Sequence, residues 1–357
     1  MLLLTALLHA LLFGILAANL LYLRRRPAAS PFPSTEKLPS LSVLVPARNE
    51  ETNLRRLLPL LLAQDYPDYE VVVYDDASTD GTWAVLERFD APHLQRLRGD
   101  GPPAGWVGKV HALYQATRGA RGERYLFLDA DTCLEDERAL RRLVAAFAAL
   151  PAGSVLTGLP RLRGGAMLLV SLVPFVILSQ LPWPLVRRLR HDALGAVNGQ
   201  CWMIDAGVYR RLEPHVHVAA EILEDVEIGR YLKRSGLTPA LVDVQREVSV
   251  FMYRGFGTAW RGFRKNAYLI AGGSPLAFAF AFAFYAVVFV LAPFTSLWLL
   301  ASLYALKAAT DLRSGMPAYV TLLTPVSFWL GALLLLDSAF HHLAGRVAWK
   351  DRRVGGR

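Results

Sequence analysis

The sequence predicts an α/β domain with a mostly parallel, Rossmann-like sheet, joined to apolar helices at both ends of the chain. Three observations support this fold class. Short apolar strands alternate with helical stretches between residues 41 and 165, the first 23 residues contain no Asp, Glu, Lys or Arg, and the chain becomes strongly apolar again after Lys265. Strands that alternate with helices favour a doubly wound sheet.

Each predicted strand ends in polar residues. Strand 42–47 is followed by Arg48, strand 70–76 ends in Asp75 and Asp76, and the run YLFL leads into Asp129 and Asp131. In open α/β sheets the ligand binds beyond the carboxyl ends of the strands, so we expect these side chains to lie at one site.

The pair Asp129 and Asp131 has a spacing that suits a divalent cation. Two hard oxygen ligands favour Mg²⁺ or Mn²⁺, and the sequence does not decide between the two. Such a metal usually also binds a substrate's phosphates. A solvated loop is the alternative interpretation of an isolated Asp-x-Asp.

Composition places the chain at a membrane. Hydrophobic residues make up 54% of the chain and charged residues only 19%, and 39 basic against 30 acidic residues give a net charge of +9. Many of the basic residues flank apolar runs, which favours an anionic membrane surface over nucleic acid as the partner. Two cysteines, Cys133 and Cys201, imply no disulfide framework.

Residues 1–23 are long enough to form an N-terminal transmembrane helix. Arg24, Arg25 and Arg26 follow it, and the positive-inside rule places them in the cytoplasm. Residues 24–40 form a Pro- and Ser-rich linker. The domain that begins at Leu41 is therefore expected on the cytoplasmic side of the cell membrane.

Six motifs, taken in order, resemble the family-2 inverting glycosyltransferases, which have the GT-A fold; they are SVLVPARNEE, VVVYDDASTDGT, GWVGK, FLDADT, NGQCWMI and ILEDVEIGRYLKRSG. The resemblance covers about residues 41–270. The later segments MYRGFGTAWRGFRKNAY and VAWKDRRV resemble the membrane-bound branch that glycosylates lipids. That branch includes carotenoid and hopanoid-associated glycosyltransferases and, more distantly, ceramide glucosyltransferase.

The resemblance implies a donor site for a nucleotide diphosphate sugar, such as a UDP-sugar. Asp131 matches the metal ligand of the family, and Asp129 would assist through the ribose or the metal's outer shell. The other residues that the resemblance places at the nucleotide are Ala47, Arg48, Glu50, Asp75, Asp76 and Lys109. From the residues alone, Asp75 and Asp76 also suit a helix N-cap, and Lys109 also suits an ordinary surface position.

The resemblance also implies the residues on the acceptor side. Asp225 matches the family's catalytic base, and Glu224 would position the acceptor or tune that base. An acidic first turn of a helix is the structural alternative. Asn198, Gly199 and Gln200 would form the acceptor loop, and Cys201 is expected to be a small packed residue.

One segment departs from the family pattern. Processive synthases and ceramide glucosyltransferase carry Gln/Arg-x-x-Arg-Trp after the base, whereas this chain has Trp260 before Arg261. A phosphate or acceptor role for Arg254, Trp260 and Arg261 is therefore open, and an amphipathic interfacial helix is an equal alternative.

The apolar segment 166–190 contains Pro174, Pro182 and Pro184. A full crossing would separate Asp225 from Asp131 by the membrane, so we expect an insertion of interfacial or re-entrant helical pieces. The predicted organisation is then a GT-A domain over residues 41–270, a C-terminal transmembrane region over 271–345 and a basic tail over 346–357. Residues 277–284 alternate like a strand, but in lipid they must be helical. The number of C-terminal crossings stays open.

The sequence thus predicts a multi-pass membrane enzyme that transfers a sugar to a hydroxyl of a lipid such as a carotenoid or another isoprenoid. Alternatives are a hopanoid or sphingolipid glycosyltransferase, a processive polysaccharide synthase, and a membrane scaffold that binds nucleotide sugar without turnover.

Overall fold

The computed structural model describes residues 2–24, 38–349 and 352–353, and the chain forms two compact units. The sheet unit comprises Leu23–Arg161 and Leu185–Val250, and the helical unit comprises Met1–Tyr22, Leu162–Pro184 and Phe251–Arg357. Parts of the predicted linker and basic tail, at 25–37, 350–351 and 354–357, lie outside the described residues.

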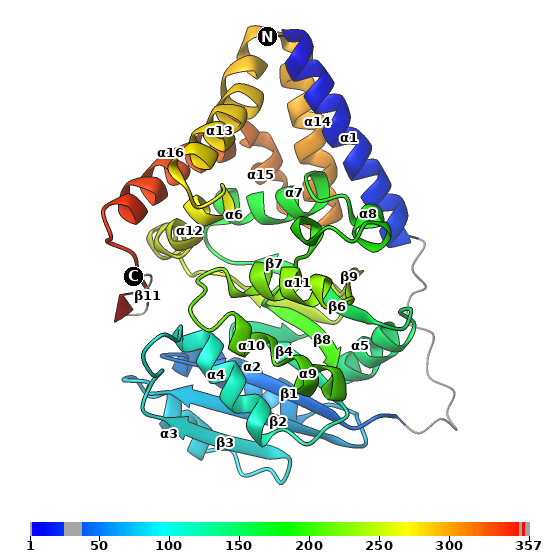
Figure 1. Cartoon of the computed structure of the whole chain (residues 1–357), viewed down its shortest axis with the longest axis vertical. Coiled ribbons are helices and arrows are strands. Elements are labelled where there is room, and N and C mark those ends of the chain that lie inside the picture. The colour runs from blue at the N-terminus through cyan, green and yellow to red at the C-terminus, as the bar shows by residue number, and fades with distance from the viewer. Residues whose placement is uncertain (1, 25–37, 350–351, 354–357) are drawn as a thin grey trace. The chain divides into compact units, whose positions relative to one another are not determined.

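A seven-stranded, mostly parallel sheet is the centre of the sheet unit, as the sequence predicts (Figure 1). In spatial order its strands are β3 (Leu94–Gly99), β2 (Tyr69–Asp76), β1 (Leu41–Ala47), β4 (Arg124–Leu128), β8 (Cys201–Asp205), β6 (Ser154–Leu159) and β9 (Thr238–Asp243). Strand β1 is parallel to β2 and β4, whereas β8 is antiparallel to both of its neighbours. The carboxyl ends of β1, β2 and β4 therefore meet at one edge.

Helices cover both faces of this sheet, which explains why its strands read as continuous apolar runs. Successive strand residues point to opposite faces, so Val43 and Val45 belong to one core and Leu44 to the other. The first core is closed by α2 (Glu51–Leu62), α3 (Thr82–Glu87) and α5 (Ala139–Ala148). The second is closed by α4 (Gly108–Gly119), α9 (Ala206–Leu212), α10 (Pro214–His217) and α11 (Glu224–Arg234), which lie in front of the sheet in Figure 1.

Short elements complete the sheet unit and its borders. Strand β5 (Thr132–Leu134) follows Asp131 directly and pairs antiparallel with β10 (Val248–Phe251). This pairing fixes the chain that leaves the Asp-x-Asp motif. The remaining short elements are β7 (Arg161–Arg163), α8 (Trp183–Arg188) and the 3₁₀ turn η1 (Asp192–Leu194).

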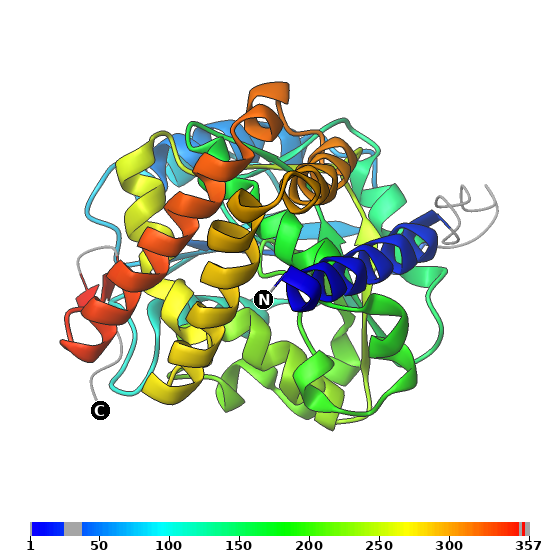
Figure 2. The ribbon, with the colours of Figure 1, turned by 90° about the horizontal axis from the view of Figure 1, so that it is seen from above.

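The helical unit contains most of the apolar sequence. Its elements are α1 (Leu2–Arg24), α6 (Met167–Val170), α7 (Leu172–Ser179), α12 (Phe256–Ile270), α13 (Pro275–Tyr285), the π-helical turn η2 (Ala286–Leu291), the 3₁₀ turn η3 (Ala292–Thr295), α14 (Leu297–Arg313), α15 (Ala318–Leu322), α16 (Thr324–Leu343), β11 (Ala348–Trp349) and β12 (Arg352–Arg353). Figure 2 shows α13 (gold) and α16 (orange to red) side by side. Residues 277–284 are helical, as lipid requires.

Three helices in the described residues are long and apolar enough to cross a membrane, namely Leu2–Arg24, Pro275–Thr295 and Thr324–Leu343. The insertion 166–190 forms no helix of that length; it is divided into α6, α7 and α8. Pro182 lies between α7 and α8 and Pro184 at the start of α8. The insertion thus consists of short helical pieces, and its interfacial or re-entrant placement stays a prediction.

Candidate active site at the carboxyl edge of the sheet

The loops that follow β1 and β2 are locked together by hydrogen bonds. The backbone N–H of Asn49 donates to Ser78 Oγ at 2.9 Å, and Asn49 Oδ1 accepts from the backbone N–H of Thr79 at 2.8 Å. Asn49 and Ala77 both have positive φ, at 53° and 51°. Asparagine tolerates this conformation, but for Ala77 it is a strain that the surrounding structure must hold, as often happens at functional sites.

Arg48 spans these two loops, because its Nη1 donates to the carbonyls of Asp76 and Ala77 at 2.8 and 3.0 Å. Asp75 is fully buried, and its Oδ1 accepts from the backbone N–H of Ser78 at 3.1 Å. This contact is a local turn and not the helix N-cap that we gave as the alternative for Asp75, because the next helix, α3, begins at Thr82. Asp76 lies next to it and is 1% exposed. Ala47 is buried at the end of β1, and Glu50 is partly exposed beside it.

A second group of charges gathers around Lys109 in the first turn of α4. Its Nζ lies 2.8 Å from Asp129 Oδ1 and 2.9 Å from Glu224 Oε1. Asp225 is next to Glu224 and interacts electrostatically with Lys109. We call Lys109, Asp129, Glu224 and Asp225 the Lys109 cluster. It joins the end of β4 to the first turn of α11.

The turn after β4 sets the two aspartates of the Asp-x-Asp motif apart. Thr132 closes this turn, because its backbone N–H and its Oγ1 both donate to the carbonyl of Asp129, at 3.1 and 2.8 Å. The Asp129 carboxylate reaches Lys109, whereas the carbonyl of Asp131 accepts from Arg56 at 3.4 Å. Both side chains are partly exposed.

The first turn of α11 is seated on the chain before β8 by two glycines. A Cβ on Gly229 would lie 2.4 Å from Ala196 Cα, and one on Gly195 would lie 2.5 Å from the carbonyl oxygen of Gly229. Neither position has room for a side chain. Backbone contact continues to the site, because the Val197 N–H donates to the Asp225 carbonyl at 3.3 Å. The position of Asp225 is therefore set by backbone packing.

The loop Asn198–Gly199–Gln200 borders the Lys109 cluster. Asn198 is anchored to β6, where its backbone N–H donates to Thr157 Oγ1 at 2.7 Å and its Nδ2 to the Gly158 carbonyl at 2.9 Å. A Cβ on Gly199 would lie 3.2 Å from Lys109 Nζ and 3.3 Å from Asp225 Cβ. The carbonyl of Gln200 accepts from the Asp129 N–H at 3.3 Å.

Burial and neighbouring charges shift the pKa values in this cluster. Burial, reinforced by the charge of Glu224, raises the pKa of Asp225 to about 6, and the charge of Lys109 opposes this rise. Burial also raises the pKa of Asp129, again against the effect of Lys109. For Lys109 itself, burial lowers the pKa, but Asp129 and Glu224 outweigh it and hold the pKa well above its ordinary value. Asp225 is thus a carboxylate of raised basicity at neutral pH.

The carboxylates suit a divalent cation only if the substrate completes the site. In the part of the chain that the structure describes, no three His, Cys, Asp or Glu side chains converge on a point where a metal ion would bind. Asp129 is ion-paired with Lys109, so Asp131 is the better candidate of the two aspartates. One or two carboxylates together with substrate phosphates are a common way to hold Mg²⁺.

The other predicted acceptor residues lie in the helical unit. Arg254 and Arg261 are exposed, and Trp260 lies on α12, where its Nε1 donates to Asp337 Oδ2 at 2.7 Å. Cys201 is fully buried in the core, as expected, and burial raises the pKa of its thiol to about 12. It is not suited to nucleophilic chemistry.

Sequence reasoning missed the residues that support this site. Thr157 and Gly158, which hold Asn198, lie in the strand SVLTGL, where they interrupt an apolar run. Within the helical unit, it also missed Asp337, the partner of Trp260, which is the acidic residue of an apolar helix. Both signals were present in the sequence.

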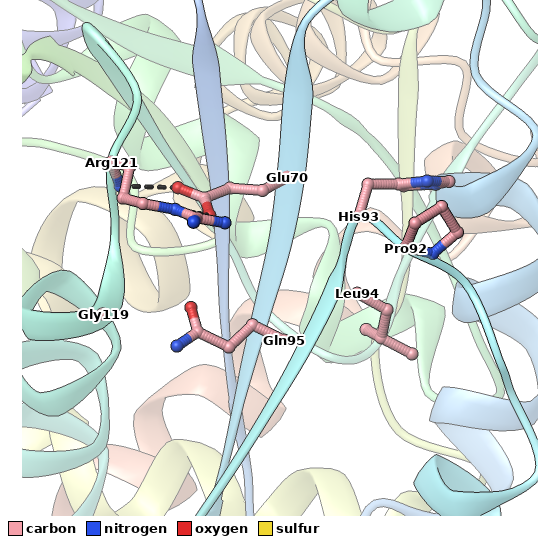
Figure 3. A pocket seen from close by; sticks show the side chains of 7 residues that line it. All are labelled: Glu70, Pro92, His93, Leu94, Gln95, Gly119 and Arg121. Carbon is pink, nitrogen blue, oxygen red and sulfur yellow. Dashed lines mark hydrogen bonds and ion pairs between the residues drawn. The ribbon is translucent and has the colours of Figure 1, made fainter.

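A shallow cavity of about 340 Å³ lies at the opposite edge of the sheet (Figure 3). It is lined by Glu70, Pro92, His93, Leu94, Gln95, Gly119 and Arg121. Glu70 is the second residue of β2, whereas Asp75 and Asp76 end that strand. Its carboxylate accepts from Ser42 Oγ at 2.7 Å and from the Arg121 N–H at 2.5 Å. These contacts hold the amino edge of the sheet together and give this cavity a structural explanation.

Comparison with known proteins agrees with the geometry. Residues 42–212 match glycosyl transferase family 2. A 4,4'-diaponeurosporenoate glycosyltransferase from Staphylococcus haemolyticus (strain JCSC1435) is 26% identical over 235 residues, which are 65% of this chain and 62% of that protein. The enzyme of the same name from Staphylococcus aureus (strain bovine RF122 / ET3-1) is 35% identical over 105 residues, 29% of this chain and 27% of that protein. The chain thus spans less than two thirds of the length of these relatives.

Among solved structures, a mannosyltransferase from Pyrobaculum calidifontis, in complex with GDP-Man and Mn²⁺, superposes with a TM-score of 0.53. It is 21% identical, and the match covers 94% of this chain and 99% of that one. At this identity the likeness establishes the fold. Together with the family match, it shows that residues 42–212 form a glycosyl transferase family 2 domain and that the fold is of the GT-A kind.

Proposed function

We propose that the protein is a membrane-bound inverting glycosyltransferase that moves a sugar from a nucleoside diphosphate sugar to a lipid. A hydroxyl oxygen of the lipid attacks the anomeric carbon, the bond from that carbon to the diphosphate oxygen breaks, and the nucleoside diphosphate leaves. Asp225 takes the hydroxyl proton. A single displacement of this kind inverts the configuration at the anomeric carbon.

The Lys109 cluster is the observation that carries the proposal. A general base acts best when its pKa lies near the working pH, and burial with Glu224 raises the pKa of Asp225 to about 6. Lys109 is ion-paired with Glu224 at 2.9 Å and with Asp129 at 2.8 Å, which leaves Asp225 as the carboxylate of the cluster that can take up a proton. A helix that needed only an acidic first turn would gain from exposed carboxylates, and Glu224 is 8% exposed.

The donor would lie at the ends of β1, β2 and β4. Arg48, Asp76 and Glu50 border the place where a nucleoside would enter, and the interlocked loops hold them there. A bound divalent cation would offset the negative charge that develops on the leaving diphosphate, and Asp131 is the residue that would hold it. Its use by this chain is supported by the Mn²⁺ in the complex of the mannosyltransferase.

The acceptor is proposed to be a carotenoid or a related isoprenoid. The relatives named above are glycosyltransferases of 4,4'-diaponeurosporenoate. Three helices suited to crossing a membrane would bring the protein to an apolar acceptor. By the positive-inside rule, Arg24 and the arginines that follow it support a cytoplasmic position for the sheet unit.

The acceptor group itself has two chemistries. A hydroxyl carries a proton that a base must remove, whereas a carboxylate, which the name diaponeurosporenoate denotes, is already an anion at neutral pH. Asp225 with its raised pKa favours the hydroxyl, and the names of the relatives favour the carboxylate. Replacing Asp225 with asparagine should therefore reduce the rate of transfer to a hydroxyl acceptor much more than the rate of transfer to a carboxylate acceptor.

The test uses the full chain in lipid nanodiscs with radiolabelled UDP- and GDP-sugars. The acceptors are 4,4'-diaponeurosporenoate and a hydroxylated carotenoid, each with Mn²⁺, with Mg²⁺ or with a chelator. We expect one labelled lipid to form with a single added sugar, and chelation to abolish it. Asp225→Asn should reduce transfer to the hydroxyl about 10²- to 10⁴-fold.

Glu227→Gln is the matched control, because Glu227 lies in the same first turn of α11 but pairs with Arg230 at 2.5 Å. It should retain activity. Equal products from Asp225→Asn and the intact protein with the hydroxylated acceptor would contradict the assignment of the base. A polymer of many sugars would identify a polysaccharide synthase, and no product with any pair would favour the binding scaffold.

A further inference from the structure

Inside the insertion between β6 and β8, the turn between α7 and α8 has several polar groups that receive hydrogen bonds from the protein itself. Helix α7 ends at Ser179, and the chain reverses before α8 begins at Trp183. The last carbonyls of a helix have no partner inside it. At a membrane surface water would satisfy them, whereas inside the hydrocarbon region the protein must do so.

Three consecutive carbonyls at the end of α7 have protein donors. The carbonyl of Val176 accepts from the Gln180 N–H at 3.0 Å, and that of Ile177 accepts from Trp183 Nε1 at 3.0 Å. The carbonyl of Leu178 accepts from Asn19 Nδ2 at 2.8 Å. The end of α7 therefore needs no water at these positions.

Asn19 makes the largest contribution to this turn, and it comes from α1. Its Nδ2 also donates to the Leu181 carbonyl at 2.8 Å, and its Oδ1 accepts from the Trp183 N–H at 2.9 Å. The side chain is fully buried and uses three of the four hydrogen bonds that an amide can make. A residue of this kind in an apolar helix is costly unless its bonds are satisfied.

The beginning of the insertion is held in the same manner from α14. Ser171, between α6 and α7, accepts a hydrogen bond from Lys307 Nζ at 3.0 Å. Lys307 is paired with Asp311 at 2.5 Å, and Asp311 accepts from Thr321 Oγ1 at 2.8 Å. Lys307 and Asp311 are 0% and 1% exposed. In Figure 1, α1 (blue) and α14 (orange) run beside each other, and His9 of α1 bonds to Ser302 of α14.

We propose that the insertion is a re-entrant element which enters the hydrocarbon region and returns, and that Asn19 is the residue that positions it for the lipid acceptor. The chain leaves the insertion through α8 and, after η1, reaches Asn198, Gly199 and Gln200, which border Asp225. This connection along the chain is the reason to expect that a change in the insertion alters acceptor binding. The acceptor part of this inference rests on the proposed function.

The first experiment measures where the turn lies and needs no enzyme activity. Cys133 is replaced by serine, the buried Cys201 is kept, and Val176, whose side chain is 39% exposed, is changed to cysteine. A membrane-impermeant maleimide is added to vesicles of either orientation. The thiol introduced by Val176→Cys should be protected from both sides, whereas a cysteine introduced in place of the exposed Asp68 should react from the cytoplasmic side.

Asn19→Leu should expose the thiol introduced by Val176→Cys. We expect its labelling to become at least about fivefold faster, because the uncapped turn opens more often. His9→Leu is the matched control: it also removes a buried polar side chain from α1, but its partners are Ser302 and the carbonyl of Val288, away from the turn. It should leave the introduced thiol protected. Asn19→Ser, which keeps one donor, should give an intermediate rate if the leucine variant fails to fold.

The second experiment measures kinetics with 4,4'-diaponeurosporenoate as the acceptor. Asn19→Leu should raise the acceptor KM about tenfold and change the donor KM less than about twofold, whereas a general loss of stability would reduce active protein without this split. Labelling of the Val176→Cys thiol from either side, with Asn19 in place, would overturn the re-entrant placement. Equal acceptor KM values for the Asn19 and His9 variants would overturn the positioning role. An inactive protein whose introduced thiol is protected would instead count against the proposed function alone.

Discussion

Two lysines show how differently the two units use buried charge. Lys109 in the sheet unit is 27% exposed and touches two carboxylates, Asp129 and Glu224, with Asp225 close by. Lys307 in the helical unit is 0% exposed and is paired with one carboxylate, that of Asp311. The Lys109 cluster therefore has more negative than positive charges, whereas the pair of Lys307 and Asp311 has one of each.

The balanced pair also has its other hydrogen bonds satisfied. Lys307 donates to Ser171 as well as Asp311, and Asp311 accepts from Thr321 as well as Lys307. A pair of this kind joins helices but has little capacity to take up a ligand. In the Lys109 cluster, by contrast, burial and the charge of Glu224 raise the pKa of Asp225, and the charge of Lys109 offsets this rise only in part. Excess negative charge in a partly buried cluster lowers the stability of the fold. It also helps to raise the pKa of a carboxylate toward the working pH, which suits a general base.

The largest expected effect tests the balanced pair. Lys307→Met leaves Asp311 buried without its cation, and breaking such a pair destabilises a protein by about 3–5 kcal/mol. The double variant Lys307→Met with Asp311→Leu should lie within about 1 kcal/mol of the intact protein, because both charges are removed together. Denaturant unfolding in detergent micelles measures both. A single variant as stable as the double one would show that the pair is not a unit.

The next effect tests the unbalanced cluster. Asp225→Asn should abolish most transfer to a hydroxyl and yet stabilise the fold. The folded pKa of Asp225, about 6, lies above its ordinary value of 3.8. Between these pH values the folded protein holds a proton that the unfolded chain has lost, so stability falls as the pH rises through this window. At pH 7 the asparagine variant should gain up to about 3 kcal/mol.

The gain should disappear below about pH 4, where the carboxyl is protonated in both states. Thermal unfolding of both proteins between pH 4 and 8 measures this difference. A variant that is less stable than the intact protein at pH 7 would mean that the charge of Asp225 is satisfied in the fold, and the contrast between the two lysines would then fail.

The sheet could be predicted from the sequence, because strands that are buried on both faces read as continuous apolar runs. The polar residues that end these runs could also be predicted to lie at one edge of the sheet. The runs VVVY and YLFL end at polar residues, and this pattern was sufficient to place Asp75, Asp76, Asp129 and Asp131 at one edge. The alternation of AFAFAFAF suggested a strand, but backbone hydrogen bonding in lipid predicted the helix that forms.

Pairing between distant residues was not predictable from one sequence. The resemblance placed Lys109 at the nucleotide, but it gave no sign that Lys109 bridges Asp129 and Glu224, as it does in the structure. Nothing local connects Asn19 with Leu178 or Lys307 with Ser171, because these contacts depend on how helices far apart in the chain pack. Isolated polar residues in apolar helices were the only signal.

The third effect concerns the pH at which the enzyme works. The charge of Lys109 lowers the pKa of Asp225 against the effect of burial and Glu224. Lys109→Met should therefore move the acidic limb of the pH–rate profile upward by about one pH unit, because the base then protonates more readily. Lys109→Arg keeps the charge and should leave the limb in place. Identical limbs for the methionine variant and the intact protein would show that Lys109 does not set this basicity.

The smallest effect concerns the spacing of the same cluster. A methyl group at Gly199 would lie 3.2 Å from Lys109 Nζ and 3.3 Å from Asp225 Cβ, so each neighbour must shift by a few tenths of an ångström. Gly199→Ala should lower kcat about 3- to 10-fold through this displacement. The free energy of unfolding should change by less than about 1 kcal/mol, since the end of the Lys109 side chain is flexible and can move aside.

Gly14→Ala is the control in the helical unit, because a methyl group there meets no atom within 4 Å. Alanine is also the better helix former, so α1 should be as stable or more stable by about 0.5–1 kcal/mol, with unchanged kcat. The two substitutions add the same methyl group. A loss of rate in Gly199→Ala without a loss of stability would therefore show that the Lys109 cluster depends on spacing, beyond the charge that Lys109 provides. If kcat is unchanged, charge alone sets the reactivity of Asp225.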